Sequence, residues 1–353
     1  EMIARLVGSE MCIRDSDWIS NNPVKKAIVV SSDLSKYELK STGEYTQGAG
    51  AIALLISENP SLISIDNVWG VATKSENDFF KPRRTFNKKE LIDEIISKLN
   101  LDISEKDFEE IFSDSTFWDN NSEIIEVFKD EPVFDGQFSN TCYLDRMQEA
   151  FVHFQQNKKT DFLNEWGHII FHLPYAFHGR RMIFNNWLNW IKNDITYKDL
   201  LAEIGQENDE LFIKKAYKSN IYKNFIASKI APGEKASSHI GNMYSASVFM
   251  SLLSMLNYHF DNNTEIKNQK VGFISYGSGS KAKIFQGEIE ANWKEKIKTS
   301  KLFESLNKRK EISFDEYQDL HKSKKISPLS NHSIRFSHTD DSTNSKGYRR
   351  YKI

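Results

Sequence analysis

The apolar residues of this chain gather in short, uninterrupted runs, and this feature most narrows the folds open to it. Lys26–Ser32 (KAIVVSS), Ala49–Ile56 (AGAIALLI) and Gly167–Phe171 (GHIIF) are such runs. Each has the length of a strand, and the first two suit strands buried on both faces. No apolar run reaches the roughly 18 residues that a membrane-spanning helix requires. The runs therefore predict a layered α/β protein.

Segments with helical periodicity separate these runs. Lys88–Leu99 and Tyr143–Gln156 carry apolar residues at helical spacing, and Gly241–Leu256 opens with a Gly-Asn turn before a strongly apolar stretch. Lys270–Ser275 and Lys281–Gln286 predict two strands around a Gly/Ser turn. This alternation of strands and helices favours α/β layers.

Charge and cysteine content exclude several classes of protein. The 353 residues include 47 Lys and Arg against 49 Asp and Glu, a net charge of −2. This balance argues against a generally basic nucleic-acid-binding surface and against an acidic tail. Cys12 and Cys142 are too few for a disulfide framework or a cysteine-rich zinc site. They fit a reducing, cytoplasmic compartment.

His172 is the first candidate for chemistry. It directly follows the run Gly167–Phe171. Pro174 favours an extended backbone at Leu173, the residue between His172 and the proline. Catalytic groups are often placed at strand ends, and a histidine there can act as a general acid or base near neutral pH. The alternative is a structural histidine that caps a strand.

Two turns made of small residues are candidate binding loops. Ser237–Ser247 (SSHIGNMYSAS) precedes a predicted helix, so its free N–H groups and the Asn242 amide could face a ligand. Tyr276–Ser280 (YGSGS) could present backbone N–H groups to an oxyanion. An ordinary helix cap and an ordinary hairpin turn are the alternatives.

Two acidic residues follow predicted strands or turns. Asp33 and Asp135 could each orient a histidine or hold a loop, and a simple Asx-turn is the alternative for both. The sequence has no P-loop, Rossmann fingerprint, HExxH or GxSxG motif.

Six segments of the chain match one known family, in order and at compatible spacing. They are VVSSDLSKYELKSTGEYTQGAGAIALLI, FFKPRR, PVFDGQFSNTCYL, FHLPYAFHGRRM, GNMYSASVF and GFISYGSGS. Together they resemble hydroxymethylglutaryl-CoA synthase over about residues 17–80 and 131–325. The resemblance implies the thiolase fold, in which two similar α/β halves surround a layered αβαβα core.

The resemblance also implies an incomplete first half. The predicted segments are 17–80 as the end of the first half, 81–130 as a helical charged insertion, 131–326 as the second half with the histidine site, and 327–353 as a polar tail. Segment 1–16 resembles neither the family nor a targeting peptide. We therefore expect it to be foreign sequence joined to a truncated reading frame.

The activity implied by the resemblance is the condensation of acetyl-CoA with acetoacetyl-CoA. A cysteine takes the acetyl group as a thioester, a glutamate removes a methyl proton, and a histidine positions and polarises the acetoacetyl carbonyl. The CoA thioesters are substrates, and no cofactor or metal is implied. The implied setting is a cytoplasmic homodimer in the mevalonate route to isoprenoids, without nucleic-acid or membrane partners.

The family's functional residues carry over motif by motif. The catalytic histidine falls on His172. The implied substrate contacts are Thr46, Asn242, Gly277 and Ser278, with Arg180 and Arg181 facing the CoA phosphates and Asp33 and Asp135 supporting the site.

Two departures from the family pattern limit this assignment. Phe177 stands where relatives often carry a lysine, so this position lacks the cation that the family pattern implies for a CoA contact. Cys12 is followed by Ile13-Arg14-Asp15, whereas the nucleophilic cysteine should be followed by small residues. We therefore expect the chain itself to be inactive. Two alternative functions remain open. One is an enzyme that adds an acetyl unit to a carrier-bound β-ketoacyl chain, and the other is a non-catalytic acyl-CoA-binding remnant.

Overall fold

The structure is a computed structural model that describes residues 19, 21–22, 24–113, 123–128, 131–206, 210–322, 335–339 and 349–352. The chain divides into two units, Glu1–Phe303 and Glu304–Ile353. The segment 1–16 and most of the tail 327–353 lie outside the described residues. The domain boundaries and the foreign origin of segment 1–16 stay predictions.

A five-stranded sheet is the centre of the first unit. Its path runs β3 (Ile63–Ile65), β11 (Lys281–Ile289), β10 (Lys270–Gly277) and β9 (Trp166–Phe171), and β4 (Gly70–Thr73) also pairs with β11. β9 and β10 are parallel, whereas β11 runs antiparallel to β10, β3 and β4. The ends of β9 and β10 therefore meet at one edge of the sheet, directly before His172.

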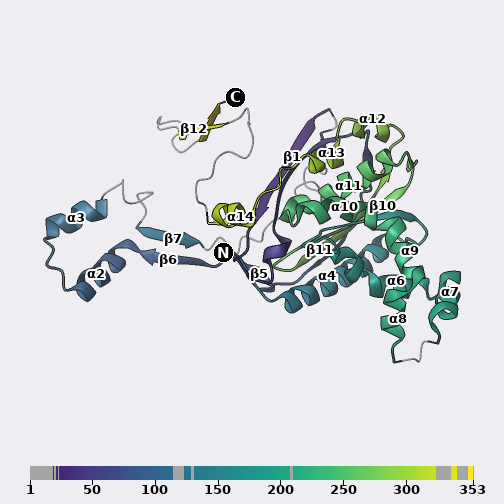
Figure 1. Ribbon diagram of the computed structural model, residues 1–353, viewed down its shortest axis with the longest axis horizontal. Helices are drawn as coiled ribbons and strands as arrows, with labels where there is room; N and C mark the ends of the chain where they lie inside the picture. Colours follow the sequence, from purple (N-terminus) through teal and green to yellow (C-terminus); the bar gives the residue numbers. More distant parts are fainter. Residues whose placement is uncertain are drawn as a thin grey trace. The chain divides into compact units, whose positions relative to one another are not determined.

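Helices and a second sheet pack on this centre in layers (Figure 1). α10 (Ala231–Ile240) and α11 (Ser247–Asp261) lie between the five-stranded sheet and the antiparallel pair β1 (Lys26–Ser35) and β2 (Gly48–Ser57). α4 (Gly136–Asn157) packs against β4, β10 and β11. The described layers follow the order βαβα, which is the predicted αβαβα order without one outer helical layer.

The remaining elements are short. In the first unit they are η1 (Glu44–Thr46), β5 (Phe79–Phe80), β8 (Val133–Phe134), α5 (His178–Met182), α6 (Phe184–Ile191), α7 (Ile195–Ile204), α8 (Phe212–Lys218), α9 (Asn220–Lys229), η2 (Tyr244–Ala246) and α12 (Trp293–Ile297). The boundary between the two units falls within α13 (Leu302–Asn307). The second unit has α14 (Phe314–His321) and the antiparallel pair β12 (Arg335–Thr339) and β13 (Arg349–Lys352). Within the described residues, no helix is long and apolar enough to cross a bilayer.

The predicted insertion is helical but also contains a β-ribbon. The helix Lys88–Leu99 is confirmed to the residue as α2, because Asn87 caps its start by accepting from two backbone N–H groups and Asn100 ends it at φ 50°. α3 (Glu105–Ser113) follows, and β6 (Arg83–Asn87) pairs with β7 (Ile124–Phe128). The ribbon was not predicted from the sequence.

Two apolar clusters hold the layers together. One lies under α4 and extends to α6–α9, where Trp166 and Phe154 are fully buried. The other fills the space around α11, where the rings of Phe273 and Phe285 stack at 4.6 Å and 2°. The close approach at Gly272 requires glycine, since a Cβ there would lie 2.1 Å from the Trp166 ring. Aromatic packing of this density supplies a large share of core stability.

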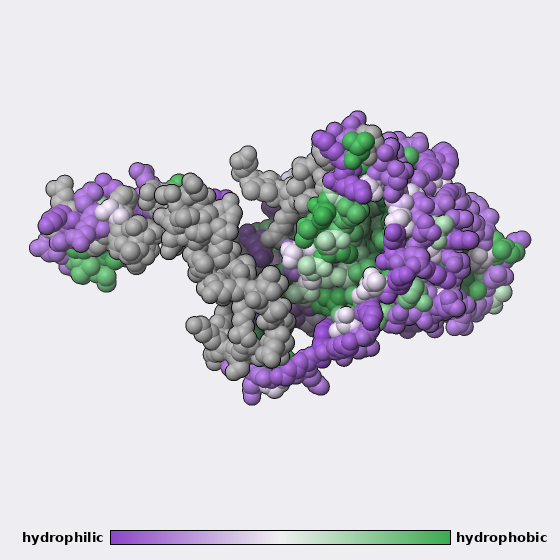
Figure 2. Space-filling view, turned by 90° about the horizontal axis from the view of Figure 1, so that it is seen from above, coloured by the Kyte–Doolittle hydropathy of each residue, from purple (hydrophilic) through white to green (hydrophobic). Residues whose placement is uncertain are grey.

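The prediction that β1 and β2 are buried on both faces is wrong for the described structure. Burial alternates along both strands, and the outward side chains of Ile28 and Leu55, which face each other across the pair, are 71% and 64% exposed. Figure 2 shows apolar surface gathered at the position of β1 in Figure 1. The physical reason is the absence of an outer layer over this face among the described residues.

This exposed face predicts self-association. Lysine at Ile28 or Val30 is expected to reduce light scattering of the concentrated chain, because charge on an open sheet face opposes its pairing. The free energy of unfolding should change by only about 0.5 kcal/mol, since both side chains already face solvent. The matched control is Val29→Lys: Val29 points into the core and is 3% exposed, so this variant should lose cooperative unfolding. Unchanged scattering in well-folded Ile28→Lys and Val30→Lys would contradict the prediction.

Candidate active site

His172 is held by its own backbone at the end of β9. Its N–H donates to the Ile274 carbonyl at 2.8 Å, and its carbonyl accepts from the Tyr143 hydroxyl at 3.2 Å. The next N–H, of Leu173, donates to Ser247 Oγ at 2.8 Å. Three different elements therefore fix the backbone from which the imidazole projects, as a positioned catalytic group requires.

The imidazole of His172 is neutral at physiological pH. Burial lowers the pKa of His172 to about 4, and a hydrogen bond with the Tyr244 backbone opposes this only in part. The residue still keeps some exposed surface. A neutral imidazole has one N–H donor and one acceptor nitrogen, so it can donate a hydrogen bond to a carbonyl oxygen without carrying charge.

The structure brings Asn242 and Thr46 together. The Asn242 N–H donates to the Thr46 carbonyl at 2.9 Å, and its side-chain oxygen accepts from the Tyr244 N–H at 2.8 Å. Gly241 allows this approach: its φ is +84°, and a Cβ there would lie 1.9 Å from the Gln47 carbonyl oxygen. The segment that carries Thr46 and the turn that carries Asn242 thus meet beside Tyr244, whose backbone forms a hydrogen bond with His172.

Asp33 supports the same turn. Its carboxylate accepts from the Ser245 N–H at 3.2 Å and from the Ser245 hydroxyl. Ser245 lies in η2, and the first residue before α11, Ala246, provides no side-chain cap. Asp33 therefore connects β1 to the turn that reaches both Asn242 and His172, and its role in the reaction stays a prediction.

The predicted turn with Gly277 and Ser278 is organised by a buried acid. Asp78, which has no exposed surface, accepts from the Tyr276 hydroxyl at 2.6 Å and from the Gly279 N–H at 2.8 Å. Gly279 has φ +101°, which glycine adopts without strain. Asp78 thus fixes both sides of the turn that carries Gly277 and Ser278.

An aromatic contact connects this turn with His172. The Tyr276 and Tyr143 rings lie 4.6 Å apart, and the Tyr143 hydroxyl is the group that donates to the His172 carbonyl. Sequence reasoning missed Asp78 and Tyr143. Asp78 directly precedes the FFKPRR segment, but its contact with Tyr276 spans 198 residues, so no local pattern indicates it.

The two predicted CoA contacts differ in their availability. The Arg180 guanidinium donates from Nε to the buried Glu234 carboxylate at 3.0 Å and lies 4.4 Å from the centre of the Phe177 ring. Burial raises the pKa of Glu234, and the Arg180 charge opposes that rise. Arg181 is exposed and donates to the Tyr175 hydroxyl at 2.9 Å. Arg181 is therefore the more accessible cation.

Asp135 lies at the start of α4. Its side chain accepts from the N–H groups of Gln137 and Phe138, at 2.8 and 2.9 Å, and the residue is exposed. This is the N-cap form of the Asx alternative. A supporting role in the reaction stays a prediction.

Cys142 is the cysteine that the structure describes, and its surroundings do not activate it. Burial, followed by the carboxylates of Asp78 and Glu76, raises the pKa of its thiol. A reactive cysteine needs the opposite, a lowered pKa. Cys12 lies outside the described residues. Within the described ranges, no group of three or more His, Cys, Asp and Glu side chains could hold a metal ion.

His178 adds a pH-sensitive group behind the site. Its ring lies 4.6 Å from Tyr143 and 4.7 Å from Tyr175, and neither ring nitrogen has a hydrogen-bond partner among the described residues. Burial, with a smaller effect of His172, lowers the pKa of His178 to about 3. The folded protein therefore holds this imidazole neutral.

We expect His178→Phe to reduce the acid sensitivity of the fold. Below about pH 6.5 the unfolded chain binds a proton at His178 and the folded chain does not, so stability falls as pH drops towards the folded pKa of about 3. From pH 7 to pH 5 the original chain should lose about 2 kcal/mol more than the variant. Urea unfolding at both pH values measures this difference. Equal losses in both proteins would show that His178 is not held neutral.

Comparison with known proteins first defines the class. A solved structure titled "MvaS in complex with 3-hydroxy-3-methylglutaryl coenzyme A" is 23% identical, with a TM-score of 0.69 over 98% of this chain and 71% of that chain. The "Curacin Biosynthetic Pathway HMG Synthase in Complex with Acetyl Donor-ACP" is 20% identical, with a TM-score of 0.65 over 90% of this chain and 61% of that chain. The chain thus has the layered thiolase-like α/β fold expected from its sequence.

The family follows from the sequence comparison. The family model "Hydroxymethylglutaryl-coenzyme A synthase C terminal" matches residues 125–346, and the chain belongs to the hydroxymethylglutaryl-CoA synthase family. It is 25% identical over 334 residues to the hydroxymethylglutaryl-CoA synthase of Haloferax volcanii and 25% identical over 306 residues to that of Enterococcus faecalis. These matches cover 90% and 85% of this chain, but only 65% and 58% of the two relatives.

Proposed function

We propose that the chain is the histidine-bearing, acceptor-binding part of a synthase that condenses acetyl-CoA with acetoacetyl-CoA in the mevalonate route to isoprenoids. The observation that carries this proposal is the neutral His172 imidazole at the end of β9, beside the turn that holds Asn242. The proposed assembly is a cytoplasmic homodimer. Family membership supports the reaction class, and the position of His172 beside the turn that holds Asn242 supports its proposed role.

In this mechanism His172 acts on the acceptor carbonyl. Its N–H donates to the ketone oxygen of acetoacetyl-CoA, which polarises the carbonyl towards attack by the acetyl carbanion equivalent. Asn242 and the backbone N–H groups at Gly277 and Ser278 hold the acyl chain. Arg181 provides a cation for a CoA phosphate, because Arg180 is already bound to Glu234. No described residue supplies the activated thiolate for the acetyl group.

Calorimetric titration with acetoacetyl-CoA tests this role on the chain as it exists. Saturable binding is expected, with affinity lowered about tenfold in His172→Ala and in Arg181→Met. His321→Ala in α14 is the control and should bind as the original chain does. A folded chain that fails to bind acetoacetyl-CoA would contradict the proposal.

The engagement of Arg180 favours a second candidate, a synthase that uses a carrier-bound acceptor. An acceptor on a carrier protein has no adenosine phosphates, so it does not need the cation that Glu234 and Phe177 occupy here. The same titration with an acetoacetyl carrier protein separates the two candidates: tighter binding than acetoacetyl-CoA favours the carrier-dependent enzyme. Binding of acetoacetyl-CoA without condensation in any completed protein favours the acyl-CoA-binding remnant.

A further inference from the structure

A pocket of about 630 Å³ opens at the edge of the five-stranded sheet opposite His172. It is lined by Gly167 and His168 at the start of β9 and by Lys270 at the start of β10. These strands are parallel, so their starts lie at the other edge from their ends. The pocket is therefore separate from the candidate active site, and its size is that of a small-molecule site.

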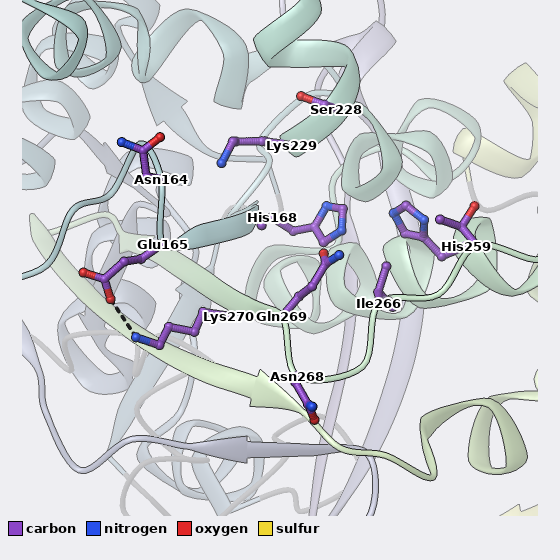
Figure 3. Close-up of a pocket in the computed structure, with 12 residues that line it drawn as sticks. Asn164, Glu165, His168, Ser228, Lys229, His259, Ile266, Asn268, Gln269 and Lys270 are labelled. Carbon is purple, nitrogen blue, oxygen red and sulfur yellow. Dashed lines mark hydrogen bonds and ion pairs between the residues drawn. The ribbon is translucent and has the colours of Figure 1, made fainter. Parts of the chain in front are cut away.

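Two buried imidazoles form one end of this pocket. His168 and His259 are only 3% and 8% exposed, and their ring centres lie 4.6 Å apart at an angle of 53°. Figure 3 shows the two rings facing each other, one from β9 and one from α11. No ring nitrogen of either residue has a hydrogen bond of normal geometry among the described residues, although the Gln269 side chain and the Lys229 backbone lie near His168.

Burial without such bonds is unfavourable for a polar group, so a ligand with matching groups would be stabilised here. Burial lowers the pKa of His168 to about 3 and also lowers that of His259. Both rings are therefore neutral near pH 7, and each has one N–H to donate.

The wall of the pocket carries a lysine ammonium that is bound by backbone carbonyls and not by a carboxylate. The Lys229 ammonium donates to the backbone carbonyls of Leu163, at 2.7 Å, and Trp166. Among the described residues it forms no ion pair, and burial lowers its pKa, which the charge of Asp161 opposes in part. The other lysine of the wall, Lys270, is paired with Glu165 at 2.6 Å.

We propose that this pocket binds a small metabolite through a phosphate group, with the phosphate oxygens accepting from His168 and His259 and with Lys229 supplying the opposing charge. An oxyanion satisfies the donors and the charge together. A divalent metal ion would instead add positive charge beside Lys229. Moreover, no third metal-binding side chain joins the two imidazoles within the described residues.

The volume indicates that the phosphate belongs to a larger molecule. A single phosphate fills only part of about 630 Å³, and the lining beyond the imidazoles includes Asn164, Ser228 and Asn268, which can bind hydroxyl groups. A sugar phosphate fits this combination. Free phosphate has the same binding chemistry, so the experiment must separate the two sources.

Calorimetric titration of the whole chain at pH 7 with ribose 5-phosphate, inorganic phosphate, ribose and zinc chloride tests the proposal. Ribose 5-phosphate is expected to bind with one-to-one stoichiometry and at least tenfold more tightly than ribose. Phosphate binding as tight as that of ribose 5-phosphate would assign the site to the free ion. Weaker phosphate binding would assign it to a phosphate ester.

Three variants locate the site. Lys229→Met and His259→Asn are each expected to weaken ribose 5-phosphate binding at least tenfold, and His168→Asn repeats the test with the other imidazole. Lys267→Met is the matched control. Lys267 is an exposed lysine on the loop that carries the lining residues Ile266 and Asn268, but it does not line the pocket itself. Binding should therefore change by less than twofold. Thermal melting confirms that each variant is folded.

Three results would overturn the proposal. The first is a folded chain that binds neither phosphate nor ribose 5-phosphate. The second is equal loss of binding in Lys267→Met and Lys229→Met, which would indicate nonspecific charge attraction. The third is stoichiometric zinc binding that depends on His168 and His259 while phosphate fails to bind. None of these measurements uses an acyl-CoA, so the outcome is independent of the proposed synthase role.

Discussion

The chain by itself is expected to condense acetyl-CoA with acetoacetyl-CoA at least about 10⁴-fold more slowly than a complete synthase of its family. The reaction begins with a thiolate, and the described cysteine, Cys142, is buried beside Asp78 with a raised pKa. Loss of the acetoacetyl-CoA absorbance, followed with and without acetyl-CoA, measures the rate. The two traces should coincide.

Labelling provides the control for this expectation. Radiolabelled acetyl-CoA should leave no stable label on the chain, and Cys142→Ser should leave the background rate unchanged. Stable acetylation of Cys12 or Cys142, accompanied by turnover, would show that the chain has a working nucleophile.

The second large effect is expected from His172→Ala in a protein completed with the amino-terminal part of a relative. Condensation should fall about a hundredfold or more, since the variant lacks the imidazole that we propose to polarise the acceptor carbonyl. Acetylation of the nucleophilic cysteine should persist, because that step acts on a different carbonyl. Burst labelling by acetyl-CoA and steady-state condensation, measured on the same sample, separate the two steps.

Two further variants sharpen this test. Asn242→Ala should lower condensation by a smaller factor, because the proposed role of Asn242 is to bind the acyl group and not to polarise the carbonyl. Its amide oxygen also accepts from the Tyr244 N–H and so holds this turn. His321→Ala should leave both steps unchanged. If His172 only caps β9, its replacement should lower the melting temperature and spare the rate per folded molecule. Normal condensation in folded His172→Ala would thus end the catalytic assignment.

Local elements could be predicted from the sequence because their causes are local. α2 matches its predicted bounds, since Asn87 and Asn100 terminate the apolar period at the two ends. β9 begins within one residue of its predicted start, where Trp166 precedes the GHIIF run. His172 follows it as predicted. In each case the signal lies within a few residues of the element.

Features that depend on distant parts of the chain could not be predicted. The apolar runs of β1 and β2 indicate strands, but whether both faces are covered depends on another layer. The buried Asp78 likewise acquires its importance from Tyr276 and Gly279 in a distant hairpin. Arg180 resembles a phosphate contact by motif, and only the fold reveals its bond to Glu234.

The pairing at the base of the predicted insertion has a consequence for how the protein can vary. The chain enters through Phe79 and Arg83 and leaves through Phe128 and Phe134, and these residues pair across two short antiparallel ladders. Entry and exit are thus held side by side, whatever length of polypeptide connects them. We therefore expect the intervening segment to tolerate changes in length or sequence, while Asp78 and α4 keep their positions in the core.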